Sequence, residues 1–224
     1  MSKKIFALIL AAAMSASVLA SCGGTKTPAD TTADTTVDTA IDTAVDTEFA
    51  EDTEEEFFED MFPAAPEVSE ELGAIHDAVK AAYGEDGYVP NMFIDPEMLA
   101  SIYGIEAEWV EEYVAEMPMI MTHVDTLIIV KPTEGNAENV LNALNAYRDY
   151  LVNDSMQYPM NIEKVRASTV FEKGGYAFFV MLGMLSDEAI FAEGTEDEIA
   201  AIQYSEAVAN NQKAIDAINA LLGE

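Results

Sequence analysis

The chain has 224 residues, of which 42 are acidic and only 10 are lysine or arginine, so its formal net charge at pH 7 is −32. A charge of this sign and size repels nucleic-acid phosphates and anionic lipid headgroups, which excludes a nucleic-acid-binding protein and a protein docked on membranes through a basic patch. The single cysteine excludes an internal disulfide.

The N-terminus has the pattern of a bacterial lipoprotein signal. Two lysines supply positive charge, an apolar run follows over residues 5–13, and the small residues 19–21 lead directly to Cys22. The apolar run is shorter than the about 20 residues that a transmembrane helix needs. We therefore expect residues 1–21 to be a signal peptide and Cys22 to carry a lipid that holds the protein on the outer face of the bacterial cytoplasmic membrane. An ordinary secretory peptide followed by a coincidental cysteine is the alternative.

Residues 22–66 are predicted to form a disordered acidic tether behind the lipidated cysteine. Aspartates recur every four residues from Asp30 to Asp46, with threonines between them. On a helix this period would stack like charges on one face, and threonine adds no helix propensity to offset the repulsion. The repeat is consistent with an O-glycosylated stalk or with a solvated spacer, which we favour. Four apolar residues near its end either pack onto the following domain, as we expect, or form a short binding motif: Phe57, Phe58, Met61 and Phe62.

Residues 67–224 are long enough for a single extracytoplasmic domain with its own core. Apolar residues at helical spacing predict long helices over residues 68–83, 137–151 and 195–222. A shorter helix is predicted over residues 96–103. The expected N-caps of three of these helices are Ser69, Asp95 and Thr195.

Strands are predicted over residues 124–130, 169–172 and 176–182. The last two are joined by a glycine-rich turn at residues 173–175, which is typical of a hairpin. Residues 106–116 are ambiguous, since they can begin as a turn and continue as a strand. This order predicts an α+β fold: a small antiparallel sheet built from two strand pairs and covered by amphipathic helices.

Short motifs follow the tether in a characteristic order: Ile102-Tyr103-Gly104-Ile105, Ile128-Ile129-Val130-Lys131, Tyr158-Pro159 and Glu172-Lys173-Gly174-Gly175-Tyr176. Together with the lipidation motif, this order resembles the bacterial lipoproteins grouped as domain of unknown function 4358, over roughly residues 70–185. The resemblance implies a lipid-anchored extracytoplasmic domain without an established activity, so it supplies no catalytic residue. Where members of that family often have an acidic residue before the second strand, this chain has Asp125, which becomes a candidate ligand-binding residue. The methionine-rich segment before Asp125 departs from the family pattern.

The methionine-rich segment is a candidate site for a soft metal. Met117, Met119, Met121 and His123 occupy alternate positions. On a strand, their side chains would project from one face at intervals of about 7 Å, and thioether and imidazole groups suit an ion such as Cu(I). Ligands with this spacing cannot all reach one ion unless the strand bends, and Pro118 limits the segment to a strand edge or entrance. We therefore favour methionines that fill the core, and we expect no cofactor.

Trp109 is the only tryptophan and the best single binding anchor, with Tyr113 close by. Aromatic faces stack on sugars, and two carboxylates can hydrolyse a glycosidic bond. Three glutamates flank these aromatic residues: Glu108, Glu111 and Glu112. A secreted wall-polymer hydrolase is therefore one alternative, although acidic residues beside aromatic ones are common on any exposed edge of so acidic a chain.

The chain lacks the short signatures of known catalytic classes, namely a nucleophile elbow, a zinc-protease helix, a Walker loop and a dinucleotide fingerprint. His76 has no second ligand at suitable spacing on its predicted helix, which favours a surface or boundary position. The sequence thus favours a non-enzymatic lipoprotein that binds a partner protein or an envelope ligand. The hydrolase, a transporter's solute-binding protein and weak binding of divalent or soft metal ions are the alternatives, and the domain is short for a two-lobed solute binder.

Overall fold

The structure is a computed structural model that describes residues 63–84, 86–120 and 122–223. The predicted signal peptide, Cys22, the tether up to residue 62 with its four apolar residues, and Met121 lie outside the described residues. In the part of the chain that is described, no helix combines the length and the apolar character needed to cross a bilayer.

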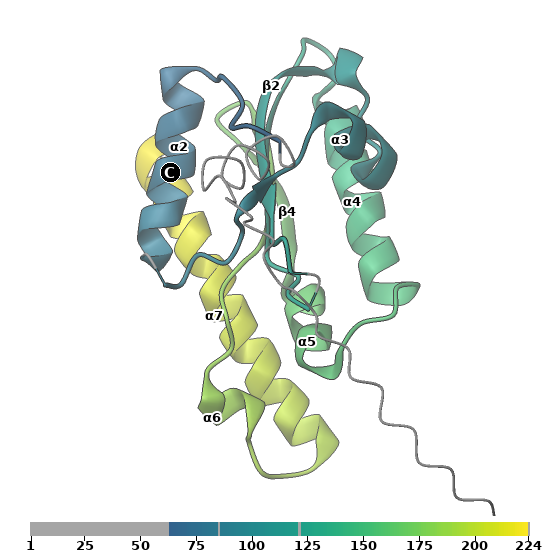
Figure 1. The fold of residues 1–224 in the computed structure, drawn as a ribbon, viewed down its shortest axis with the longest axis vertical. Coiled ribbons are helices and arrows are strands. Elements are labelled where there is room, and N and C mark those ends of the chain that lie inside the picture. The colour runs from purple at the N-terminus through teal and green to yellow at the C-terminus, as the bar shows by residue number, and fades with distance from the viewer. Residues whose placement is uncertain (1–62, 85, 121, 224) are drawn as a thin grey trace, which may run out of the picture. The chain divides into compact units, whose positions relative to one another are not determined.

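A five-stranded antiparallel sheet forms the centre of the domain, with the strand order β1-β2-β3-β5-β4 (Figure 1). The strands are β1 Met92–Phe93, β2 Val110–Met117, β3 Thr126–Pro132, β4 Thr169–Lys173 and β5 Tyr176–Met181. The two central strands, β3 and β5, are buried over most of their length. They read as continuous apolar runs because helices cover both faces of the sheet.

The helices are α2 Glu70–Tyr83, α3 Pro96–Tyr103, α4 Ala137–Asn153, α5 Pro159–Ala167, α6 Asp187–Ile190 and α7 Glu196–Leu222, with a 3₁₀ turn, η1, at Ala107–Trp109. Helices α2 and α7 cover one face of the sheet, and α3 and α4 cover the other (Figure 1). Successive residues of β3 alternate between the two cores: Ile128 packs toward α4, whereas Leu127 and Ile129 pack toward α2 and α7. The predicted α+β fold with an antiparallel sheet is confirmed.

Local chemistry sets the ends of the predicted helices. The side chains of Ser69, Asp95 and Thr195 each accept a hydrogen bond from a backbone amide in the first turn of α2, α3 and α7. The hairpin between β4 and β5 turns at Gly174 and Gly175, whose φ angles are 60° and 84°. Two successive positive φ angles are what a tight hairpin turn requires, and glycine adopts them without strain.

The structure adds β1, α5 and α6 to the predicted elements, and it divides residues 106–116 into η1 and β2. Strand β1 has only two residues, too few to show a period. The buried residues of α5 include Asn161, Glu163 and Lys164, so this helix shows no apolar stripe in the sequence. Both elements are held by tertiary partners rather than by their own composition.

Candidate functional site

A cluster of polar side chains surrounds Glu116, near the end of β2. Glu116 is only 3% exposed and lies on the sheet face that α2 covers. His76 Nε2 on α2 lies 2.8 Å from Glu116 Oε2, and the Tyr88 hydroxyl donates to the same oxygen at 2.5 Å. The Lys80 ammonium lies 3.7 Å from Oε1. Donors from α2 and from the loop before β1 therefore converge on one buried carboxylate.

The environment keeps Glu116 ionised and Tyr88 neutral. Burial by itself raises the pKa of Glu116, but the hydrogen bonds from His76 and Tyr88 and the nearby Lys80 charge outweigh it, so the pKa falls below its ordinary value of 4.5. Burial, followed by the charge of Glu116, raises the pKa of Tyr88 well above its usual range. An ionised carboxylate can only accept hydrogen bonds. His76 Nε2 is therefore the protonated nitrogen, and it donates the hydrogen bond to Glu116.

A pocket of about 560 Å³ adjoins this cluster, and we refer to it as the Glu116 pocket. Its wall combines polar groups with apolar surface: Lys80, Tyr88, Pro90, Asn91, Phe93 and Glu116. Pockets of this size, with a few convergent polar groups and ionisable residues whose pKa values are shifted, are typical of small-molecule sites.

The expectation that His76 lies at the surface or boundary of the domain is wrong. His76 is buried, and its partner Glu116 lies forty residues further along the chain. One sequence signal pointed to this burial, because His76 follows Leu72 by four residues and precedes Val79 by three, on the apolar stripe of α2. The partner was not visible, since only the pairing of β2 with the sheet brings Glu116 under α2.

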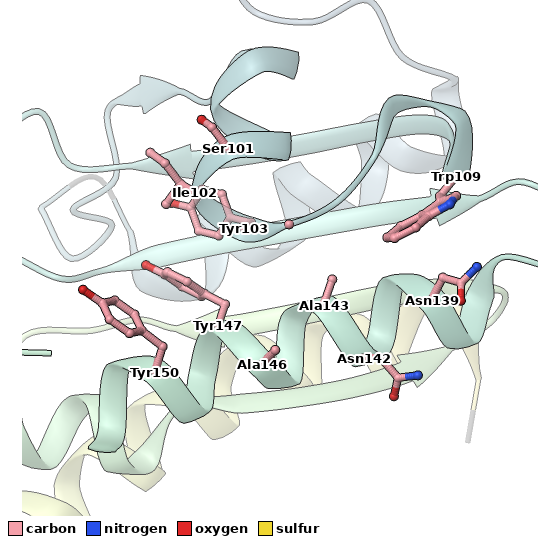
Figure 2. Close-up of a pocket in the computed structure, with 11 residues that line it drawn as sticks. Ser101, Ile102, Tyr103, Trp109, Asn139, Asn142, Ala143, Ala146, Tyr147 and Tyr150 are labelled. Carbon is pink, nitrogen blue, oxygen red and sulfur yellow. The ribbon is translucent and has the colours of Figure 1, made fainter. Parts of the chain in front are cut away.

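A second candidate site is an open groove of about 500 Å³ between α3 and α4, on the other face of the sheet (Figure 2). Trp109, the predicted binding anchor, lines this groove together with Tyr103, Tyr147 and Tyr150. We call it the Trp109 groove. Its remaining lining is small or uncharged: Ser101, Ile102, Gly104, Asn139, Asn142, Ala143 and Ala146.

The aromatic residues of the groove are held at different depths. The ring centroids of Tyr103 and Tyr147 are 4.5 Å apart, and that of Tyr147 is 5.5 Å from that of Phe179 in the core. Tyr150 is 54% exposed and lies at the same end of the groove as Tyr147 (Figure 2). Two rings are thus fixed by the core, whereas Tyr150 offers a free face to a ligand.

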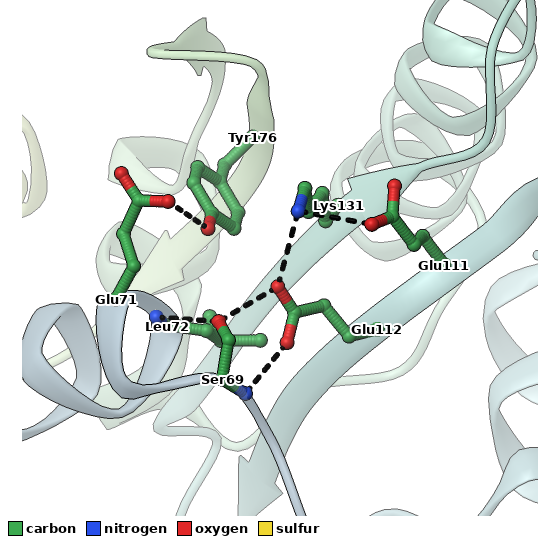
Figure 3. A network of polar contacts seen from close by, with 7 residues as sticks. All are labelled: Ser69, Glu71, Leu72, Glu111, Glu112, Lys131 and Tyr176. Atoms are coloured by element: carbon green, nitrogen blue, oxygen red, sulfur yellow. Dashed lines mark hydrogen bonds and ion pairs between the residues drawn. The ribbon is translucent and has the colours of Figure 1, made fainter.

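Tyr113 and the three glutamates near Trp109 do not line this groove. The Tyr113 hydroxyl donates to the carbonyl of Ile94 at 3.0 Å. Glu112 accepts from the backbone N–H of Ser69 at 2.8 Å and from its hydroxyl at 2.9 Å, and Lys131 lies 3.5 Å away (Figure 3). Glu111 pairs with the same lysine at 3.0 Å. Glu112 thus connects the start of α2 to the sheet, whereas Glu111 pairs within the sheet. Glu108 is exposed and lies outside the groove lining.

Burial favours a raised pKa for Glu112, but the Ser69 hydrogen bonds and the Lys131 charge lower it overall. A glycosidase needs one carboxylic acid with a raised pKa to protonate the leaving group. Glu112 therefore does not have the raised pKa of a general acid, and its hydrogen bonds with Ser69 join β2 to the N-terminus of α2.

The strands and helices that form the Trp109 groove, together with Tyr88 and Glu116, fall in one contiguous segment of the chain. Residues 85–182 match the family described as Domain of unknown function (DUF4358). This confirms the resemblance drawn from the short motifs. No curated protein and no solved structure matches the chain. The DUF4358 segment contains the whole sheet, the Trp109 groove, Tyr88 and Glu116, whereas His76 and Lys80 precede it.

Asp125, the acidic residue that the family resemblance singled out, lies inside the DUF4358 segment but is fully buried. Its Oδ2 lies 2.5 Å from Lys164 Nζ on α5. Its Oδ1 has no hydrogen-bond partner among the described residues. The structure thus places Asp125 in a buried ion pair at the start of β3, away from the lining of both candidate sites.

The DUF4358 segment also contains the methionine-rich run, which does not continue as a strand. Strand β2 ends at Met117, which packs on the α3 side of the sheet as expected for a core residue. Met119 is 48% exposed and His123 is exposed, both in the connection to β3. The described residues therefore do not form the one-face array that alternation predicted. In the same described ranges, no group of three or more histidine, cysteine or acidic side chains is placed to hold a metal.

Proposed function

We propose that this protein is a lipid-anchored extracytoplasmic binding module that holds an uncharged glycan of the cell envelope in the Trp109 groove. The lipidation pattern at Cys22 supports the anchor, and the acidic tether supports a domain that stands off the membrane. The observation that carries the glycan proposal is the composition of the groove.

The residues that line the groove are all uncharged, although the protein is strongly acidic. Charged residues make up 23% of the chain, yet none lies among the groove's lining residues. Trp109, Tyr147 and Tyr150 offer apolar ring faces with polar edges. The amides of Asn139 and Asn142 offer both donors and acceptors. A sugar presents the complementary surface, since its C–H face is apolar and its hydroxyls are polar. The small side chains of Ala143 and Ala146 let a ring approach the surface of α4 closely.

The same lining argues for binding without hydrolysis. A glycosidase places two carboxylates on either side of the scissile bond. The glutamates nearest to Trp109 in sequence are bound to Ser69 and Lys131 or lie outside the groove. The proposal is therefore a glycan-binding module rather than a wall-polymer hydrolase.

Trp109 supplies a built-in test, because it is the only tryptophan and its fluorescence reports on the groove directly. The chain from residue 22 onward, unlipidated through Cys22→Ser, is titrated with chitotetraose as the uncharged glycan probe. We expect a saturable blue shift of the emission and no cleavage products. Tyr150→Ala should weaken binding by at least about tenfold, which corresponds to about 1.4 kcal/mol.

Tyr158→Ala is the matched control, because Tyr158 is similarly exposed but lies outside the groove. It should bind chitotetraose as the unsubstituted chain does. An unchanged emission at saturating probe, or equal weakening by the two tyrosine substitutions, would exclude the groove as a glycan site.

A further inference from the structure

The buried carboxylate of Glu116 has one oxygen, Oε1, that accepts no hydrogen bond from the residues that the structure describes. Oε2 accepts from both His76 and Tyr88. Lys80 Nζ forms an ion pair with Oε1 at 3.7 Å, which is beyond hydrogen-bond distance. An ionised carboxylate has about four acceptor positions. Glu116 therefore has unused acceptor capacity where it lines the Glu116 pocket.

The ion pair between Lys80 and Glu116 Oε1 is weak. The Lys80 side chain is 43% exposed, and its ammonium lies 5.3 Å from the centre of the Tyr88 ring. An ion pair with so exposed a partner contributes little, typically about 0–1 kcal/mol. The chain's own alkylammonium group thus rests between an aromatic face and a carboxylate, the two groups that recognise organic cations.

We propose that the Glu116 pocket binds a small primary alkylammonium ligand that displaces the Lys80 ammonium. The ligand's N–H groups donate to Glu116 Oε1, and its positive charge lies against the Tyr88 ring. Its apolar chain packs on Pro90 and Phe93, which complete the wall of the pocket. The volume of about 560 Å³ accommodates a ligand of this class.

The charges of the site select a cation over other ligands. An anion would face the buried charge of Glu116, and Lys80 is the only cationic side chain among the lining residues. A metal ion would have only one carboxylate as a ligand here, because His76 Nε2 is already hydrogen-bonded to Glu116 and has no lone pair free for a metal. The net charge of −32 further raises the local concentration of small cations.

The proposal is tested by calorimetric titration of the full mature chain, unlipidated through Cys22→Ser, with pentylamine, which is protonated at pH 7. Pentanol, with the same alkyl chain and no charge, is the matched probe. We expect measurable binding of pentylamine, at least about tenfold tighter than that of pentanol, and loss of this preference in Glu116→Gln.

Lys80→Met provides a test that an impaired fold cannot mimic, because it should increase affinity for pentylamine several-fold by removing the internal competitor. Lys213→Met is the control, since Lys213 also lies over a tyrosine ring, that of Tyr83, but outside the pocket. It removes the same charge and should leave the affinity nearly unchanged.

Weaker binding in Lys80→Met, an equal gain in Lys213→Met, or pentanol binding as tightly as pentylamine would each overturn the proposal. This site lies on the opposite face of the sheet from the Trp109 groove, so its failure leaves the glycan proposal untouched.

Discussion

Lys164 Nζ lies 2.5 Å from Asp125 Oδ2, and the two residues are 39 positions apart in the chain. Both side chains are almost completely buried, so the pair joins the start of β3 to α5 without access to water. Removing two charges from water is costly, and their attraction offsets this only while both partners are present. We therefore expect the pair to fix the position of α5 more than it stabilises the fold.

Lys164→Met should lower the free energy of unfolding by about 3–5 kcal/mol, because it leaves the Asp125 carboxylate buried without a counter-charge. The double substitution Asp125→Leu with Lys164→Met removes both charges and should recover most of that loss. Urea unfolding of the two variants measures the difference, with Lys173→Met on the edge strand β4 as the control for loss of one lysine. A double variant as unstable as the single one would show that the pair itself stabilises the protein.

Stability should fall in acid partly through Glu116. Its pKa is lowered in the folded protein, so its contribution is complete above the ordinary pKa of 4.5 and is lost as the pH falls through the folded-state value. Glu112 acts in the same direction, because its pKa is also lowered. Thermal melts between pH 7 and pH 3 should therefore show a smaller loss of stability for Glu116→Gln than for the unsubstituted chain.

The matched control for this pH series is Glu172→Gln, which neutralises an exposed carboxylate on β4. It should retain the pH dependence of the unsubstituted chain. If Glu116→Gln retains it as well, the hydrogen bonds of Glu116 do not contribute to acid sensitivity.

Cys22→Ala should release the protein from membranes or block its processing, because the net charge of −32 opposes any other attachment to lipid. Cell fractionation followed by a high-salt and carbonate wash measures this. Processed Cys22→Ala protein that still sediments with membranes would contradict the lipid anchor.

Much of the local structure could be predicted because its causes lie within a few residues. Ser69, Asp95 and Thr195 cap helices through amides three positions away. Gly174 and Gly175 set the hairpin through their own backbone freedom. Strands β3, β4 and β5 follow from runs of apolar residues that are visible in the sequence.

The sequence singled out individual residues of the candidate sites, but it did not show which residues the fold brings together. Trp109 is chemically conspicuous, so it was identified as an anchor, but Tyr147 and Tyr150 reach the same groove from α4 only after α3 and α4 have packed. Met119 was expected in the core on the basis of alternation, whereas the strand ends at Met117 and leaves it exposed. Alternation gives a side chain's face only while the strand continues.

The sequence by itself determined the acidic charge, the lipidation pattern and most of the helices and strands, because these depend on composition and on neighbouring residues. Only the tertiary structure decided that His76 meets Glu116 and that Asp125 meets Lys164. Each pair joins the sheet to a helix that is distant in sequence. The two side chains become neighbours, shielded from water, only when the strands have paired and the helices have packed on the sheet.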